Sequence, residues 1–130
     1  MTRKKAREEA FILIFEKAFN DNTVEEILEV AKEVRDLEPD DYINKVFFGV
    51  FENIEEIDAL ISEKAVGWKI SRISKTALSI LRLAIYEIKY FDDIPNSVSI
   101  NEAVELSKIY ATKEDASFVN GILSTIVKEL

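Results

Sequence analysis

The chain has 130 residues, enough for one domain, and its composition of 48% hydrophobic and 32% charged residues is typical of a folded protein. It contains neither cysteine nor histidine. Disulfides, zinc–thiolate and iron–sulfur sites, thiol nucleophiles and Ser-His catalysis are therefore excluded, and we expect no cofactor and no metal site. The missing cysteines also fit a reducing cytoplasm, where we expect the protein to work.

The net charge of −8 argues against a general nucleic-acid binder, but the charge is unevenly distributed. Residues 1–20 carry five basic and three acidic side chains, a local charge of +2. Residues 21–66 carry four basic and fourteen acidic side chains, a charge of −10, and residues 67–130 carry eight of each. The amino terminus is thus a basic patch on an acidic protein.

The apolar run after the basic start covers only six residues from Ala10, and no window approaches 18 apolar residues. We expect neither a signal peptide nor a membrane span.

Hydrophobic periodicity predicts three helices before Gly67. The first spans about residues 3–19. The second begins at a capping box formed by Thr23 and Glu26. The third is long, from about residue 39 to residue 65, with Pro39 in its first turn. Gly49 inside it predicts close approach of a neighbouring helix, and Gly67 predicts a left-handed helix end.

After Gly67 the pattern predicts a short helical turn over 68–73 and three more helices. Ser71 or Ser74 caps a helix over about 75–91, which is apolar on most sides and therefore central. A second capping box, Ser99 with Glu102, is expected to open a helix over 100–110. Thr112 caps the last helix, from about residue 113 to the end. The fold class is all-α.

Four segments, taken together, resemble the NusB family. They are RKKARE at 3–8, GWKISRI at 67–73, ILRLAIYEI at 80–88 with SINEAVELSK at 99–108, and FVNGIL at 118–123. The resemblance covers the whole chain. It implies a seven-helix bundle in two halves, three helices plus four, which we place at about 1–66 and 67–130 of a single RNA-binding domain. Because the chain ends directly after this module, we expect no catalytic domain and no enzymatic activity.

The resemblance also implies a function in transcription antitermination. Members of the family pair with NusE, a small-subunit ribosomal protein. The pair binds boxA RNA in nascent transcripts, notably those of ribosomal RNA operons, and joins the antitermination complex of RNA polymerase. Family members are monomers or homodimers, and the sequence leaves that choice open.

The predicted RNA-binding residues combine cations, an amide and an aromatic ring. A helix amino terminus attracts anions, and clustered cations add Coulomb attraction and counterion release. The helix cap does not need Asn101, so its amide is available for base edges. Phe118 is either core, in phase with Ile122, or a stacking platform for an unpaired base. The full set is Arg3, Lys4, Lys5, Arg7, Asn101, Lys108 and Phe118.

Four further residues are candidates for contact with the protein partner: Trp68, Arg82, Tyr86 and Glu87. Trp68 and Tyr86 are equally explained by packing, and Arg82 and Glu87 by internal ion pairing that braces the two halves. Gly121 predicts close helix contact, and Asn120 a bond to a neighbouring helix. As an alternative function, the acidic face makes the chain a helical protein–protein adaptor that binds no RNA.

Overall fold

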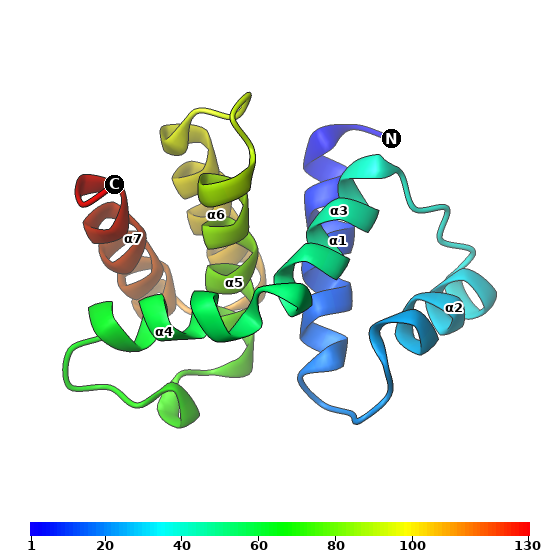
Figure 1. Cartoon of the computed structure of the whole chain (residues 1–130), viewed down its shortest axis with the longest axis horizontal. Helices are drawn as coiled ribbons and strands as arrows, with labels where there is room; N and C mark the ends of the chain where they lie inside the picture. The colour runs from blue at the N-terminus through cyan, green and yellow to red at the C-terminus, as the bar shows by residue number, and fades with distance from the viewer.

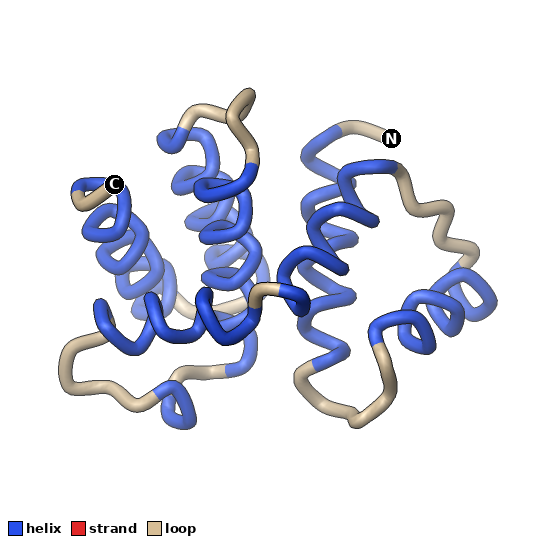
Figure 2. The backbone as a smooth tube through the Cα atoms, in the orientation of Figure 1, coloured by secondary structure: helices blue, strands red, loops and turns tan.

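The computed structural model describes residues 1–130 and contains seven α-helices, one short 3-10 helix and no strand. Figure 2 shows the helices joined by short loops. The all-α prediction is confirmed. The elements are α1 (Arg3–Lys17), α2 (Val24–Arg35), α3 (Asp41–Glu52), α4 (Ile54–Lys64), η1 (Ile70–Arg72), α5 (Lys75–Tyr90), α6 (Asn96–Tyr110) and α7 (Lys113–Lys128).

The long helix predicted over residues 39–65 is wrong, because the chain bends at Asn53. The backbone of Asn53 leaves the helical region, with φ −116° and ψ 23°, and its side-chain amide donates to the Gly49 carbonyl at 2.8 Å. Such a local bond competes with helix continuation. The apolar stripe keeps its helical spacing across the bend, so periodicity alone does not reveal it. Asp40, and not Pro39, begins α3 as its N-cap.

The bend divides the bundle into two groups of helices (Figure 1). In one group α1 contacts α2 and α3, and in the other α4 packs on α5 and α7 while α6 packs on α5 and α7. Three α-helices precede the bend at Asn53 and four follow it, while the boundary expected at about residue 66 stays a prediction. The centre is α5, which contacts α1 and α3 as well as α4, α6 and α7. Eleven of its sixteen residues are buried.

Three predicted helix caps are present. Thr23 and Glu26 form the capping box of α2, Ser74 caps α5, and Thr112 caps α7. Each satisfies backbone N–H groups that have no partner inside the helix. The cap predicted at Ser99 is wrong, since α6 begins earlier, at Asn96, and Ser99 lies inside it.

The three glycines have different environments. Gly67 adopts φ 83°, the left-handed helix end predicted for it. Gly49 is confirmed as a point of close approach, because a Cβ there would overlap the Tyr86 ring of α5. The close helix contact predicted at Gly121 is wrong: apart from the backbone of its own helix, no atom lies within 4 Å of the place where its Cβ would be.

Candidate nucleic-acid interface

A buried polar network joins α1 to the centre of the bundle. The Arg7 guanidinium donates twice to the Glu87 carboxylate of α5, through Nε at 2.6 Å and a terminal nitrogen at 3.2 Å. The same carboxylate accepts hydrogen bonds from the hydroxyls of Tyr42 on α3 and Ser99 on α6, the latter at 2.8 Å. Glu87 is fully buried and Arg7 is 4% exposed. Four helices from both groups therefore meet at one carboxylate.

The network raises the pKa of two of its members, Arg7 and Tyr42. Burial alone would lower the pKa of Arg7, but the hydrogen bond and charge of Glu87 outweigh it, and the pKa is raised. The pKa of Tyr42 is raised as well, first by burial and then by the charge of Glu87. Both groups thus keep their protons, and the buried charge of Glu87 stays compensated.

Arg7 therefore differs from the three basic residues before it. Arg3, Lys4 and Lys5 are all exposed in the first turn of α1. Arg3 lies over the Tyr42 ring, 4.5 Å from its centroid. The Lys5 amine contacts Glu8 at 3.0 Å and Glu9 at 3.4 Å, and the Glu8 hydrogen bond raises the pKa of Lys5.

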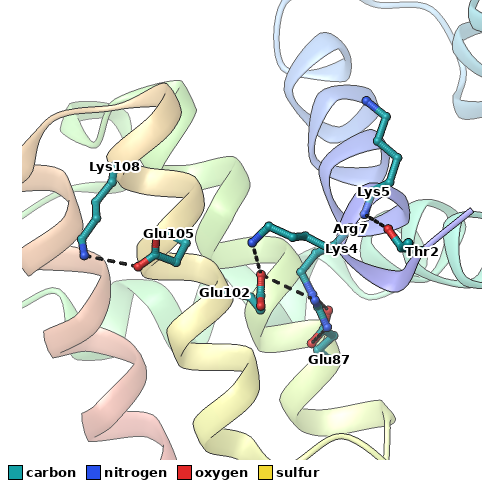
Figure 3. A network of polar contacts seen from close by, with 8 residues as sticks. All are labelled: Thr2, Lys4, Lys5, Arg7, Glu87, Glu102, Glu105 and Lys108. Carbon is teal, nitrogen blue, oxygen red and sulfur yellow. Dashed lines mark hydrogen bonds and ion pairs between the residues drawn. The ribbon is translucent and has the colours of Figure 1, made fainter.

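Lys4 reaches from α1 to α6, where its amine lies 3.5 Å from the carboxylate of Glu102 (Figure 3). One helical turn further along α6, Glu105 pairs with Lys108 at 3.3 Å. The Figure 3 view shows Lys4, Glu102, Glu105 and Lys108 in a row that runs from α1 towards α7. The start of α1 and the outer face of α6 therefore form one surface of alternating charge.

This surface continues into a groove between α6 and α7 with a volume of about 660 Å³. The groove brings together Asn101 and Lys108, both predicted from the sequence. It adds polar groups that the site prediction omitted, namely Lys113, Ser117 and Asn120 of α7. Their spacing of three and four residues places them on one helix face, and that was the available signal. Asn120 is exposed and makes no hydrogen bond to a neighbouring helix.

Phe118 and Trp68 lie together on the other flank of α7. Their ring centroids are 6.1 Å apart, edge to face. Phe118 is partly buried against the core, whereas Trp68 is 54% exposed. The two rings line a cavity of about 150 Å³ with Arg72, Ile73, Ser74, Glu114 and Asp115. Trp68 thus adjoins a predicted RNA residue, although the sequence assigned it to the protein partner.

The other predicted partner residues are engaged inside the bundle. Arg82 donates twice to Asp58 of α4, at 2.9 and 2.8 Å. Tyr86 is 6% exposed and covers Gly49, and Glu87 belongs to the buried network. The contacts favour internal bracing for Arg82 and Glu87.

An acidic surface lies on the side of α3 and α4, where Glu52, Glu55 and Glu56 line a shallow hollow of about 360 Å³. Glu56 pairs with Lys89, and the other two carboxylates have no ion-pair partner. No group of carboxylates is arranged to hold a metal ion. None of the helices combines the length and apolar character that crossing a membrane requires.

Comparison with known proteins identifies relatives over the whole chain. Residues 4–128 match the model of the NusB family. The transcription antitermination protein NusB of Listeria monocytogenes serotype 4a (strain HCC23) is 43% identical over 99% of this chain and 98% of its own length. The crystal form of T. maritima NusB superposes with a TM-score of 0.89 at 36% identity, covering 99% of this chain and 92% of the other. A third relative comes from the crystal structure of antitermination factors NusB and NusE in complex with dsRNA. It superposes with a TM-score of 0.87 at 27% identity, covering 98% of this chain and 97% of the other.

Proposed function

The chain belongs to the NusB family of transcription antitermination proteins, and from that premise we propose that it pairs with NusE and binds boxA RNA in nascent transcripts. The family consists of antitermination factors and not of enzymes, as the resemblance of the sequence led us to expect. The observation that carries the proposal is the match over nearly every residue to proteins of this name, one of which was crystallised with NusE and dsRNA.

In this proposal the RNA lies along the first turn of α1, the outer face of α6 and the groove between α6 and α7. Arg3, Lys4 and Lys5 contact phosphates, because their charge carries no base information. Asn101 and Lys108 continue the track into the groove. Phe118 offers its ring to an unpaired base. Arg7 supports this surface from beneath, since its guanidinium is already bound to Glu87.

In the same proposal, NusE, a ribosomal protein, binds on the acidic side of the molecule. The unpaired carboxylates near the bend between α3 and α4 complement a basic partner, and such complementarity raises the rate of association more than the affinity. The pair would then join the antitermination complex of RNA polymerase in the cytoplasm. A homodimer that covers the α1–α6 surface would compete with RNA.

The test is binding of labelled boxA RNA to the chain, with and without NusE, over a range of salt concentrations. The pair is expected to bind more tightly than the chain alone. The double variant Arg3→Ala/Lys4→Ala should weaken binding to all RNAs and reduce the salt slope by about 1.4, or 0.7 for each lost contact to a single strand. Lys128→Ala is the matched control, because this exposed lysine lies in the last turn of α7.

The adaptor alternative predicts a different result. An acidic helical adaptor would bind NusE and show no salt-dependent affinity for boxA RNA. Equal RNA affinity with and without NusE would also contradict the proposal.

A further inference from the structure

Three cations without an ion-pair partner stand close together in the segment that runs from Gly67 to the first residue of α5. Residues 67–75 carry three cations, Lys69, Arg72 and Lys75, and no carboxylate. None of the three takes part in an ion pair. Lys75 lies over the Phe19 ring, 5.4 Å from its centroid, but Lys69 and Arg72 are exposed and free.

The only tryptophan of the chain stands in the same segment. Trp68 follows the left-handed turn at Gly67 and is 54% exposed, so much of its large apolar ring faces solvent. The indole ring makes an edge-to-face contact with Phe118. Cations interleaved with an exposed aromatic ring are the usual composition of a surface that grips single-stranded nucleic acid.

The position of this segment connects it with the proposed RNA surface. On α7, Lys113, Ser117 and Asn120 face the groove beside α6, whereas Glu114, Asp115 and Phe118 face Trp68. The first turns of α7 are therefore a ridge between the groove and the Trp68 cavity. The ridge carries Gly121, where the surrounding space is empty. A helix glycine with no packing partner suits close approach of a ligand backbone.

We propose that residues 67–72 form a second RNA-binding element, in which an unpaired base stacks on Trp68 beside Phe118 while Lys69 and Arg72 bind the flanking phosphates. This inference rests on the proposed function, because the strand reaches Trp68 by crossing α7 from the groove. Glu114 and Asp115 line the same cavity and repel phosphate. The cavity therefore receives the uncharged base, and the phosphates lie outward, beside the two free cations.

A protein contact at Trp68 is the competing assignment, since the sequence grouped this residue with those facing NusE. The contacts favour RNA. Trp68 touches Phe118 and lies beside free cations, whereas the acidic surface suited to a basic protein is on the side of α3 and α4. A basic partner would meet Lys69 and Arg72 as like charges.

The single tryptophan makes the test direct. In the full chain labelled with fluorotryptophan, Trp68 gives one ¹⁹F resonance. Adding NusE alone should leave this resonance in place, and adding boxA RNA to the pair should shift it. A shift on adding NusE alone, with no further change on adding RNA, would overturn the proposal in favour of the protein contact.

Affinity measurements on variants complete the test. Trp68→Ala should weaken binding of boxA RNA to the pair by about 5- to 150-fold, and Trp68→Phe should restore most of it. Lys69→Ala and Arg72→Ala should each reduce the salt slope by about 0.7, while Lys128→Ala leaves it unchanged. Melting temperatures measured beside these affinities identify a variant that fails to fold. If Trp68→Ala fails to fold, the salt slopes of Lys69→Ala and Arg72→Ala decide whether the second RNA-binding element exists.

Two failures are distinguishable. If the pair binds boxA RNA but Trp68→Ala, Lys69→Ala and Arg72→Ala all keep wild-type affinity and salt slope, the second element is refuted and the proposed function stands. If the wild-type pair binds no boxA RNA at any salt concentration, the proposed function fails and this inference fails with it.

Discussion

Replacing Arg7 by methionine separates its two candidate functions, phosphate contact and internal brace. Methionine keeps an unbranched apolar stem but removes the cation that compensates Glu87. The fully buried carboxylate is then left with two neutral donors, the hydroxyls of Tyr42 and Ser99. Removing one partner of a buried ion pair costs about 3–5 kcal/mol, because the remaining charge is uncompensated.

The size of the chain converts this cost into a melting temperature. The unfolding entropy of 130 residues is about 0.27 kcal/mol/K, so Arg7→Met should lower the melting temperature by about 11–18 °C. The double variant Arg7→Met/Glu87→Gln removes the orphaned charge and should regain part of this loss. Scanning calorimetry on the wild type, both single variants and the double variant gives the coupling between the two residues.

Lys4→Ala is the matched control, since Lys4 lies one turn earlier on α1 and its ion pair with Glu102 is exposed. Such a pair contributes about 0–1 kcal/mol, so the melting temperature should change little while RNA affinity falls. Arg7→Met should do the opposite, with unchanged RNA affinity per folded molecule. If Arg7→Met melts like the wild type and loses RNA affinity as Lys4→Ala does, Arg7 is a phosphate contact and the bracing argument is wrong.

Three further outcomes are expected. Gly49→Ala should destabilise the fold by about 1–3 kcal/mol, because the added Cβ overlaps the Tyr86 ring. Gly121→Ala should instead stabilise the fold by about 0.5–1 kcal/mol, because Gly121 lies on a helix in open space. Similar calorimetric shifts for the two variants would contradict this reasoning. Tyr42 has a raised pKa in the folded state, so its contribution to stability is intact below pH about 10 and is lost above it, where the unfolded chain ionises first. Tyr42→Phe should therefore make the fall of the unfolding free energy above that pH shallower, by at most about 1.4 kcal/mol per pH unit. Urea denaturation at several pH values measures this slope, and an unchanged slope would refute the linkage. Phe118→Leu keeps an apolar side chain in the partly buried site, so it should cost less than about 1.5 kcal/mol of stability and still weaken RNA binding; retained affinity would assign Phe118 to the core alone.

Short sequence patterns predicted the helix caps that depend on contacts within one helical turn. The caps at Thr23, Ser74 and Thr112 depend on a side chain and a backbone N–H only three residues away, so the pattern predicts them, although it left Ser71 as an alternative to Ser74. Ser99 shows where this reasoning fails. Serine followed by glutamate three residues later also occurs inside helices, and here the Ser99 hydroxyl donates to Glu87 on another helix.

Arg7 was predicted as a phosphate contact because it belongs to a basic cluster, yet the sequence held a signal against that assignment. Residue 7 lies three, four and seven residues before Ala10, Phe11 and Ile14, all of them buried, so it belongs to the buried stripe of α1. The partner that makes a buried arginine tolerable is Glu87, 80 positions away. No local pattern supplies a contact at that separation.

The acidic residues on the proposed RNA surface bear on why a partner protein is needed. Lys4, Lys5 and Lys108 each lie within 3.5 Å of a carboxylate. These exposed pairs stabilise the fold by about 1 kcal/mol at most, so phosphate can displace the carboxylates, but each displacement reduces the net gain from binding RNA. The chain's charge of −8 opposes RNA further. A basic partner bound over the acidic side of α3 and α4 would reduce that repulsion without touching the RNA surface.

Coupling of this kind is reciprocal, so boxA RNA must raise the affinity for NusE by the same factor by which NusE raises the affinity for RNA. Two independent titrations measure these factors, and their shared value should fall as salt screens the charges that produce it.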